Sequence, residues 1–163
     1  QIDFPVTSRL MKQFPEILSL SFNRLEPEGH IIPHCGDTNA IVRCHLGLYI
    51  PKEENKCVFK VRGESRNWQT AEWLVFTDAY THEAINNAKE SRYILLMDVL
   101  RDEFANKRNL VTSTVLTSLF LQKRAQNFKI LYKFPSRVIK LIAFILLPFA
   151  LISSRVINYF KVY

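Results

Sequence analysis

Four histidines and a few arginines carry most of the chemistry that this sequence offers. His30, His34 and His45 fall in the stretch HIIPHCGDTNAIVRCHLGL together with Arg43, and the fourth histidine is His82, in TDAYTHEAINN. Imidazole serves as a metal ligand and a proton carrier, whereas guanidinium binds carboxylates through a planar fork of donors. These residue types in so short a stretch predict a site for a metal ion or a small carboxylate.

The residues from 39 to 50 have strand character, and a strand would sort their side chains onto two faces. Arg43, His45 and Gly47 would share one face, where a guanidinium and an imidazole two residues apart could hold a small carboxylate. A solvated strand face is the alternative. The opposite face is expected to pack in the core and holds Val42, Cys44, Leu46 and Leu48.

The remaining histidines lie close to predicted strand ends. His34 follows a proline at a strand entrance, His82 lies near a strand boundary, and Arg92 begins the next apolar strand. Two imidazoles with open positions are a way to hold non-haem Fe(II) for oxygen chemistry. An arginine deeper in a barrel would suit a dicarboxylic co-substrate, although a structural role for each histidine is the plainer alternative. Trp68 and Trp73 are expected to be core or rim residues.

The elements that must position these residues are strands. Residues 17–100 are rich in β-branched and aromatic residues and are interrupted by turn residues at close spacing. A short helix over residues 6–14 is expected to precede strands over residues 18–25, 39–50, 57–68, 72–80, 83–85 and 92–100. Short strands with no helices between them predict a mainly β antiparallel sandwich or barrel.

Three motifs in this region resemble the aspartyl/asparaginyl beta-hydroxylase family. They are PHCGDTNAIVRCHLGLYIP, WQTAEWLVFTDAYTHE and RYILLMDV, and the resemblance covers roughly residues 15–100. Members of this family are Fe(II)- and 2-oxoglutarate-dependent dioxygenases on a double-stranded β-helix (cupin or jelly-roll) fold. The resemblance therefore implies that fold, Fe(II) and 2-oxoglutarate with O₂, and hydroxylation of a C–H bond.

The resemblance also implies roles for individual residues. His34 and His82 would ligate iron as the catalytic centre. Arg92 would pair with the distal carboxylate of 2-oxoglutarate, and Arg43 and His45 would complete that pocket.

One position departs from the usual iron site of related dioxygenases. Gly36 stands where the facial triad has its carboxylate ligand, as it also does in the family resembled here. Such a vacancy leaves room for a halide, so hydroxylation is expected but not required. Asp78 is the carboxylate that we expect to hydrogen-bond a ligating imidazole and so fix its tautomer.

The charge of the chain is unevenly distributed. Residues 1–100 contain 11 Lys and Arg against 13 Asp and Glu, whereas residues 101–163 contain 11 against 2, for a net charge of +7 overall. We therefore expect a dioxygenase domain over residues 1–100 and a basic helical tail over residues 101–163. Three cysteines without a CxxC pair indicate a reducing, cytoplasmic setting. Because the chain begins with Gln1, we expect its natural N-terminus to precede this residue.

The tail combines positive charge with apolar runs. Residues 102–132 have helical spacing, and residues 141–154 are fourteen uncharged residues, fewer than the roughly twenty that span a bilayer as a helix. Cations on both sides favour contact of residues 129–161 with an anionic membrane surface. A buried core or dimer helix is the alternative.

Several functions fit these patterns. The leading hypothesis is a dioxygenase that hydroxylates the β-carbon of an aspartyl or asparaginyl residue in a peptide or protein. A lipid acyl chain is the alternative substrate, because bacterial lipid hydroxylases resemble this domain and also carry membrane-associated segments. A non-catalytic, cupin-like binding module tethered to a membrane is the hypothesis from another class. Nucleic-acid binding is not expected, since the basic tail lacks the interleaved aromatics of a base-stacking surface.

Overall fold

The computed structural model describes residues 4–127, 142, 145–146 and 148–149. The chain divides into two compact units, residues 1–103 and residues 104–163. No helix in the described part of the chain is long and apolar enough to cross a membrane. Most of the predicted membrane-contact region, residues 129–161, lies outside the described residues.

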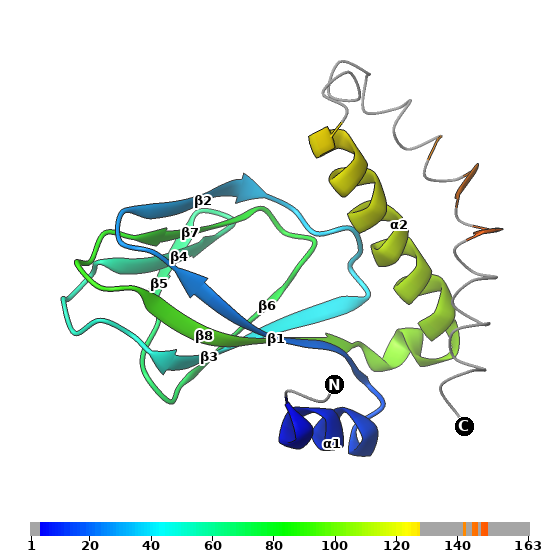
Figure 1. The fold of residues 1–163 in the computed structure, drawn as a ribbon, viewed down its shortest axis with the longest axis horizontal. Coiled ribbons are helices and arrows are strands. Elements are labelled where there is room, and N and C mark those ends of the chain that lie inside the picture. The colour runs from blue at the N-terminus through cyan, green and yellow to red at the C-terminus, as the bar shows by residue number, and fades with distance from the viewer. Residues whose placement is uncertain (1–3, 128–141, 143–144, 147, 150–163) are drawn as a thin grey trace. The chain divides into compact units, whose positions relative to one another are not determined.

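The first unit is mainly β, and Figure 1 shows its strands as two facing layers. A helix α1 (Pro5–Gln13) precedes eight strands: β1 (Ile17–Leu25), β2 (Gly29–His34), β3 (Ile41–Tyr49), β4 (Cys57–Val61), β5 (Glu64–Asn67), β6 (Trp73–Thr77), β7 (His82–Asn86) and β8 (Arg92–Leu100). A 3₁₀ helix η1 (Asp102–Lys107) follows β8 and leads into α2 (Arg108–Asn127). The helical character predicted for residues 102–132 is thus found up to residue 127.

The strands form two antiparallel sheets of four. Their orders are β1-β8-β3-β6 and β2-β7-β4-β5. Eight strands that alternate between two facing four-stranded sheets are the arrangement of a jelly roll. The predicted double-stranded β-helix fold is therefore confirmed.

Two strands differ from the sequence prediction. The stretch from 57 to 68 is a hairpin, because Arg62 and Gly63 both have positive φ (51° and 88°) and form the two-residue turn between β4 and β5. The strand β2, which contains Pro33, was not among the predicted strands. β2 lies at the edge of its sheet, where a proline removes no ladder hydrogen bond.

The core lies on the face of β3 that we expected to be polar. The ring of His45 lies 5.2 Å from the rings of both Phe59 and Phe76, measured between centroids. The interpretation of the opposite face as the core is wrong, because Leu48 on that face is exposed and of its four residues only Cys44 is buried. The face that carries His45 and Gly47 points into the sandwich, where both residues are buried.

Candidate functional site

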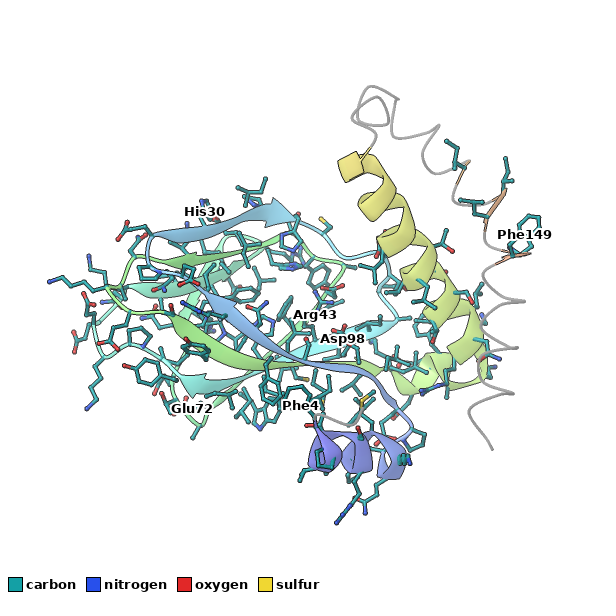
Figure 2. All side chains as sticks on the ribbon, viewed as in Figure 1. Phe4, His30, Arg43, Glu72, Asp98 and Phe149 are labelled. Atoms are coloured by element: carbon teal, nitrogen blue, oxygen red, sulfur yellow. The ribbon has the colours of Figure 1, made fainter. Side chains whose placement is uncertain are left out.

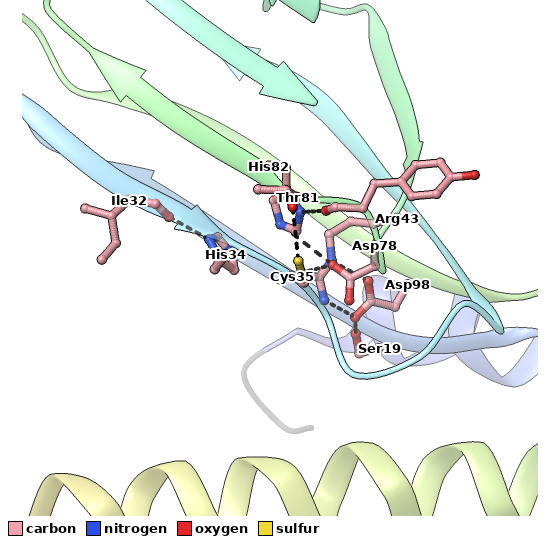
Figure 3. A network of polar contacts seen from close by, with 10 residues as sticks. Ser19, Ile32, His34, Cys35, Arg43, Asp78, Thr81, His82 and Asp98 are labelled. Atoms are coloured by element: carbon pink, nitrogen blue, oxygen red, sulfur yellow. Dashed lines mark hydrogen bonds and ion pairs between the residues drawn. The ribbon is translucent and has the colours of Figure 1, made fainter. Parts of the chain in front are cut away.

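The two histidines proposed as ligands are brought together by strand pairing. His34 ends β2, His82 begins β7, and the two residues are direct partners in the antiparallel register. Their ring centroids are 4.2 Å apart. His82 is buried, whereas His34 is exposed. The sheet thus holds two imidazoles, far apart in the sequence, at one edge of the sandwich (Figure 3).

Both imidazoles present the same nitrogen for metal binding. Nδ1 of His34 lies 2.9 Å from the carbonyl oxygen of Ile32, and Nδ1 of His82 lies 2.7 Å from that of Tyr80. Because a carbonyl oxygen only accepts, Nδ1 carries the proton in each ring and Nε2 keeps its lone pair. Burial lowers the pKa of His82, which favours its neutral form. A carbonyl-oriented neutral imidazole is the form that ligates a metal.

Asp78 fills the space beside the ligand pair. Its Oδ1 lies 3.8 Å from Nε2 of His82, on the nitrogen that would face a metal. The predicted hydrogen bond from a ligating imidazole to Asp78 is therefore not formed, since the Nδ1 donors bind backbone carbonyls instead. A Cβ atom placed on Gly36 would lie 1.7 Å from Oδ2 of Asp78. The carboxylate of Asp78 thus occupies the volume that a side chain at position 36 would need.

Arg43 is held by two carboxylates at this edge. Its Nε and Nη2 donate to Oδ1 and Oδ2 of Asp98 at 2.7 and 3.0 Å, and its Nη1 lies 2.7 Å from Oδ1 of Asp78. Ser19 donates to the same Asp98 carboxylate at 2.9 Å. Arg43 and Asp98 are labelled in Figure 2, and the close-up in Figure 3 shows their side chains pointing toward each other. We refer to Arg43, Asp78 and Asp98 as the carboxylate clamp.

The clamp determines the protonation of its members. Burial alone would lower the pKa of Arg43, but the hydrogen bonds and charge of Asp98, and then the charge of Asp78, raise it above its usual value. Burial raises the pKa of Asp78, and Arg43 opposes that rise. The guanidinium already binds two carboxylates, and these contacts use three of its five N–H donors. Its predicted place in the 2-oxoglutarate pocket stays a prediction.

A second cluster, in the barrel interior, contains buried polar groups without partners. Nε and Nη1 of Arg92, both ring nitrogens of His45 and Nε1 of Trp68 have no hydrogen-bond partner among the described residues. The Arg92 guanidinium lies over the Trp68 ring at 4.3 Å, and the His45 ring stacks on Trp68 with centroids 5.9 Å apart. We call these three residues the anion chamber, since an unpaired buried cation is costly until an anion reaches it.

Burial dominates the electrostatics of the chamber. It lowers the pKa of Arg92 to about 10. It also lowers the pKa of His45 to about 3, with a further contribution from the charge of Arg92. His45 is thus neutral at physiological pH and can either donate or accept one hydrogen bond at each nitrogen. A cation beside a neutral donor is suited to a carboxylate.

A cavity leads toward this chamber from the open side of the sandwich. It has a volume of about 1010 Å³ and is lined by residues of β5 and β6, which are one edge strand of each sheet. Phe59, Trp68 and Phe76 are among its lining residues, and all three contact the ring of His45. This volume is sufficient for a small organic ligand.

Two residues of the site were missed by the sequence analysis. Asp98 lies in the motif RYILLMDV and shares its strand face with Arg92. An acidic residue on the same face as a proposed site arginine was the signal that could have identified it. Trp68 offered no such signal, because a lone tryptophan after a strand is usually a packing residue. His30, in contrast, lies outside the site and bonds Glu83 at 2.7 Å on the surface.

The geometry combines a two-histidine edge with an interior anion chamber, and no cluster of three or more His, Cys, Asp or Glu suited to a metal occurs in the described part of the chain. Residues 1–102 match the family described as Aspartyl/Asparaginyl beta-hydroxylase. The chain belongs to this family, whose name is that of a hydroxylase.

Individual relatives are similar over the same region. The ornithine lipid ester-linked acyl 2-hydroxylase of Rhizobium tropici is 33% identical over 97 residues, which are 60% of this chain and 34% of that protein. The human aspartyl/asparaginyl beta-hydroxylase is 35% identical over 104 residues, 61% of this chain and 14% of that protein. The chain therefore spans about a third or less of the length of these two curated relatives.

Two solved structures superpose on part of this chain. A predicted oxalate decarboxylase from Thermotoga maritima superposes with a TM-score of 0.45 at 13% identity, covering 58% of this chain and 74% of that chain. A cupin protein from Bacteroides fragilis superposes with a TM-score of 0.41 at 15% identity, covering 51% and 65%.

Proposed function

We propose that the chain is an Fe(II)- and 2-oxoglutarate-dependent dioxygenase that hydroxylates a C–H bond. The observation that carries this proposal is the buried guanidinium of Arg92, which has two nitrogens without a hydrogen-bond partner among the described residues and lies inside the same barrel as the histidine pair. A dicarboxylic co-substrate that chelates the metal with one end would place its other carboxylate deeper in the barrel. The chamber supplies the cation for that carboxylate.

The edge of the sandwich that holds His34, His82, Asp78 and Arg43 is called the metal edge below. Its two histidines fit Fe(II). His34 and His82 offer two Nε2 lone pairs, and imidazole is a suitable ligand for iron. When bound, Fe(II) together with 2-oxoglutarate and O₂ supplies the oxidising power for hydroxylation, with release of succinate and CO₂. The chain's own contribution is to hold the ligands in one tautomer, to orient the co-substrate and to exclude bulk water from the barrel.

The position of Asp78 favours hydroxylation over halide transfer. The volume beside Gly36, which a missing carboxylate would leave for a halide, contains the Asp78 carboxylate. A halide would have to displace an anion that is paired with Arg43. We propose that Asp78 orients a water molecule at the metal edge, because its Oδ1 faces the side of His82 that would bind the metal.

The substrate we favour is an aspartyl or asparaginyl side chain in a peptide or protein. Support comes from membership of the family that is described by this reaction. This assignment is a proposal for the whole protein, since the chain spans only part of its relatives.

A lipid acyl chain is the second candidate substrate. The relative from Rhizobium tropici acts, by its name, on an ester-linked acyl group of a lipid. The net positive charge of residues 101–163 would favour an anionic membrane surface, with contact through residues 129–161 and a cytoplasmic location.

The cofactor assignment is tested by anaerobic titration with Fe(II) and then 2-oxoglutarate. We expect the visible charge-transfer band of the chelate in the wild type, no band in His82→Ala, and a band that needs far more 2-oxoglutarate in Arg92→Ala. His30→Ala is the matched control, because this histidine bonds a surface carboxylate outside the site. A folded wild type without a band would contradict the proposal and favour a non-catalytic binding module.

The substrate classes are separated by parallel assays. Succinate release would be measured with a soluble peptide that contains Asp and Asn, and with liposomes of an acylated lipid. Hydroxylated product only on the liposomes would reject the peptide assignment.

A further inference from the structure

Trp68 has an unused donor inside the anion chamber. Its side chain is 4% exposed, and its Nε1–H has no acceptor in the part of the chain that the structure describes. An indole can only donate, and burying a donor without a partner costs free energy. Packing alone does not account for this residue, because a phenylalanine would fill the same place without that cost.

The Arg92 guanidinium does not occupy the position in front of the Trp68 donor. The Arg92 guanidinium carbon lies 4.3 Å from the centroid of the Trp68 ring, over its face. The indole N–H lies at the edge of the ring and points within the ring plane, so the cation does not block it. Contact with the ring face also stabilises the guanidinium while no anion is bound.

The same residue connects the chamber with the cavity. Trp68 lines the cavity of about 1010 Å³ between β5 and β6. Trp68 therefore contacts both this cavity and Arg92, whose guanidinium lies over its ring.

We infer that Trp68 is a co-substrate-binding residue, whose Nε1–H donates to the distal carboxylate of 2-oxoglutarate beside Arg92. This inference rests on the proposed function. A carboxylate has two oxygens with about four lone-pair sites, so the fork of one arginine leaves acceptor capacity for a further donor. The chamber thus selects ligands by two donors that converge on one carboxylate.

The direct test is an NMR titration of the indole N–H signals. The sequence has two tryptophans, so Trp73→Phe leaves the indole signal of Trp68 alone. The ¹⁵N-labelled variant, loaded with diamagnetic Zn(II), would be titrated with 2-oxoglutarate and with 2-oxobutanoate, which lacks the distal carboxylate. We expect the Trp68 proton to move downfield with 2-oxoglutarate only. A proton unmoved at saturation would overturn the inference.

The affinity test uses Trp68→Phe, which keeps an aromatic ring under Arg92 and removes the donor. Calorimetry should show about tenfold weaker binding of 2-oxoglutarate and unchanged binding of 2-oxobutanoate. Equal losses for both ligands would overturn the inference, as would no loss for either. If this variant fails to fold, the NMR titration of Trp73→Phe still tests whether Trp68 donates to the carboxylate.

Arg92→Met separates the inference from the proposed function. If Arg92→Met weakens the binding of 2-oxoglutarate and Trp68→Phe does not, only the inference about Trp68 is rejected. A wild type that does not bind 2-oxoglutarate rejects both.

Discussion

The two ends of the site differ in how their buried charges are balanced. At the metal edge, Arg43 lies 2.7 Å from an oxygen of Asp98 and 2.7 Å from an oxygen of Asp78. In the anion chamber, Nε and Nη1 of Arg92 lack a partner within the described residues, and the guanidinium lies over Trp68. Arg43 is thus paired with carboxylates of the chain itself, whereas two nitrogens of Arg92 have no partner among the described residues.

This difference has opposite consequences for stability and binding. Removing one member of a buried ion pair leaves its partners uncompensated. Removing a buried cation that has no counter-ion instead removes the desolvation free energy of that charge and stabilises the fold. The same change from arginine to methionine should therefore act in opposite directions at the two ends.

The largest effect is expected from Arg43→Met. It leaves Asp78 and Asp98 without their counter-ion, and we expect the free energy of unfolding to fall by about 3 kcal/mol. Urea unfolding of the metal-free protein measures this loss. Arg24→Met is the control, because Arg24 pairs with Glu26 on the surface and should leave stability nearly unchanged. Equal stability of Arg43→Met and wild type would show that the clamp is not a structural pair.

Arg92→Met should separate stability from binding. We expect the metal-free protein to become more stable by about 1 kcal/mol, since an unpaired charge is no longer buried. The affinity for 2-oxoglutarate should fall about 100-fold or more, because the distal carboxylate loses its cation. Thermal unfolding and calorimetry measure the two quantities on one preparation. A loss of stability similar to that of Arg43→Met would remove the contrast between the two ends.

Gly36→Ala tests the metal edge by steric means. The new Cβ would lie 1.7 Å from Oδ2 of Asp78, so the carboxylate must move. We expect Fe(II) affinity to fall about 10- to 100-fold, as for other changes beside a metal ligand. Gly63→Ala is the matched control: its position has φ of 88° but open space, so it should lower stability without changing metal affinity. Unchanged affinity in Gly36→Ala would show that Asp78 does not act at the metal.

The smallest effect is the pH dependence that His45 gives to stability. Burial, followed by the charges of Arg92, Arg43 and His82, lowers its pKa to about 3 from 6.5. The unfolded chain therefore binds the extra proton first, and stability falls as the pH drops from about 6.5 toward 3. Between about pH 7.5 and 5.5 the loss should be about 1.4 kcal/mol.

His45→Phe should remove that part of the acid sensitivity. The substituted ring fits among Phe59 and Phe76, so the core stays apolar. Urea midpoints at several pH values measure the difference between the two proteins. Parallel curves for variant and wild type would contradict the assigned pKa of His45.

Much of the site could be predicted from particular residues. Alternation along a strand placed Arg43 and His45 on one face, and this holds in β3 because the side-chain period of a strand is two. Spacing could not show that Arg43 is bound by carboxylates, since its partner Asp98 lies 55 positions away and meets it only through the β3–β8 register. The spacing also could not show that the face of β3 with Arg43 and His45 points into the sandwich.

The sequence by itself determined the fold class, the family and the histidine pair, because these follow from local periodicity and from motifs that are continuous along the chain. Only the tertiary structure decided that Arg43 is paired, that two nitrogens of Arg92 lack a partner among the described residues, and that Asp78 fills the space beside Gly36. It also added Trp68 to the chamber. These properties depend on distances between strands that are remote in sequence, and charge balance in a barrel is a property of the packed interior.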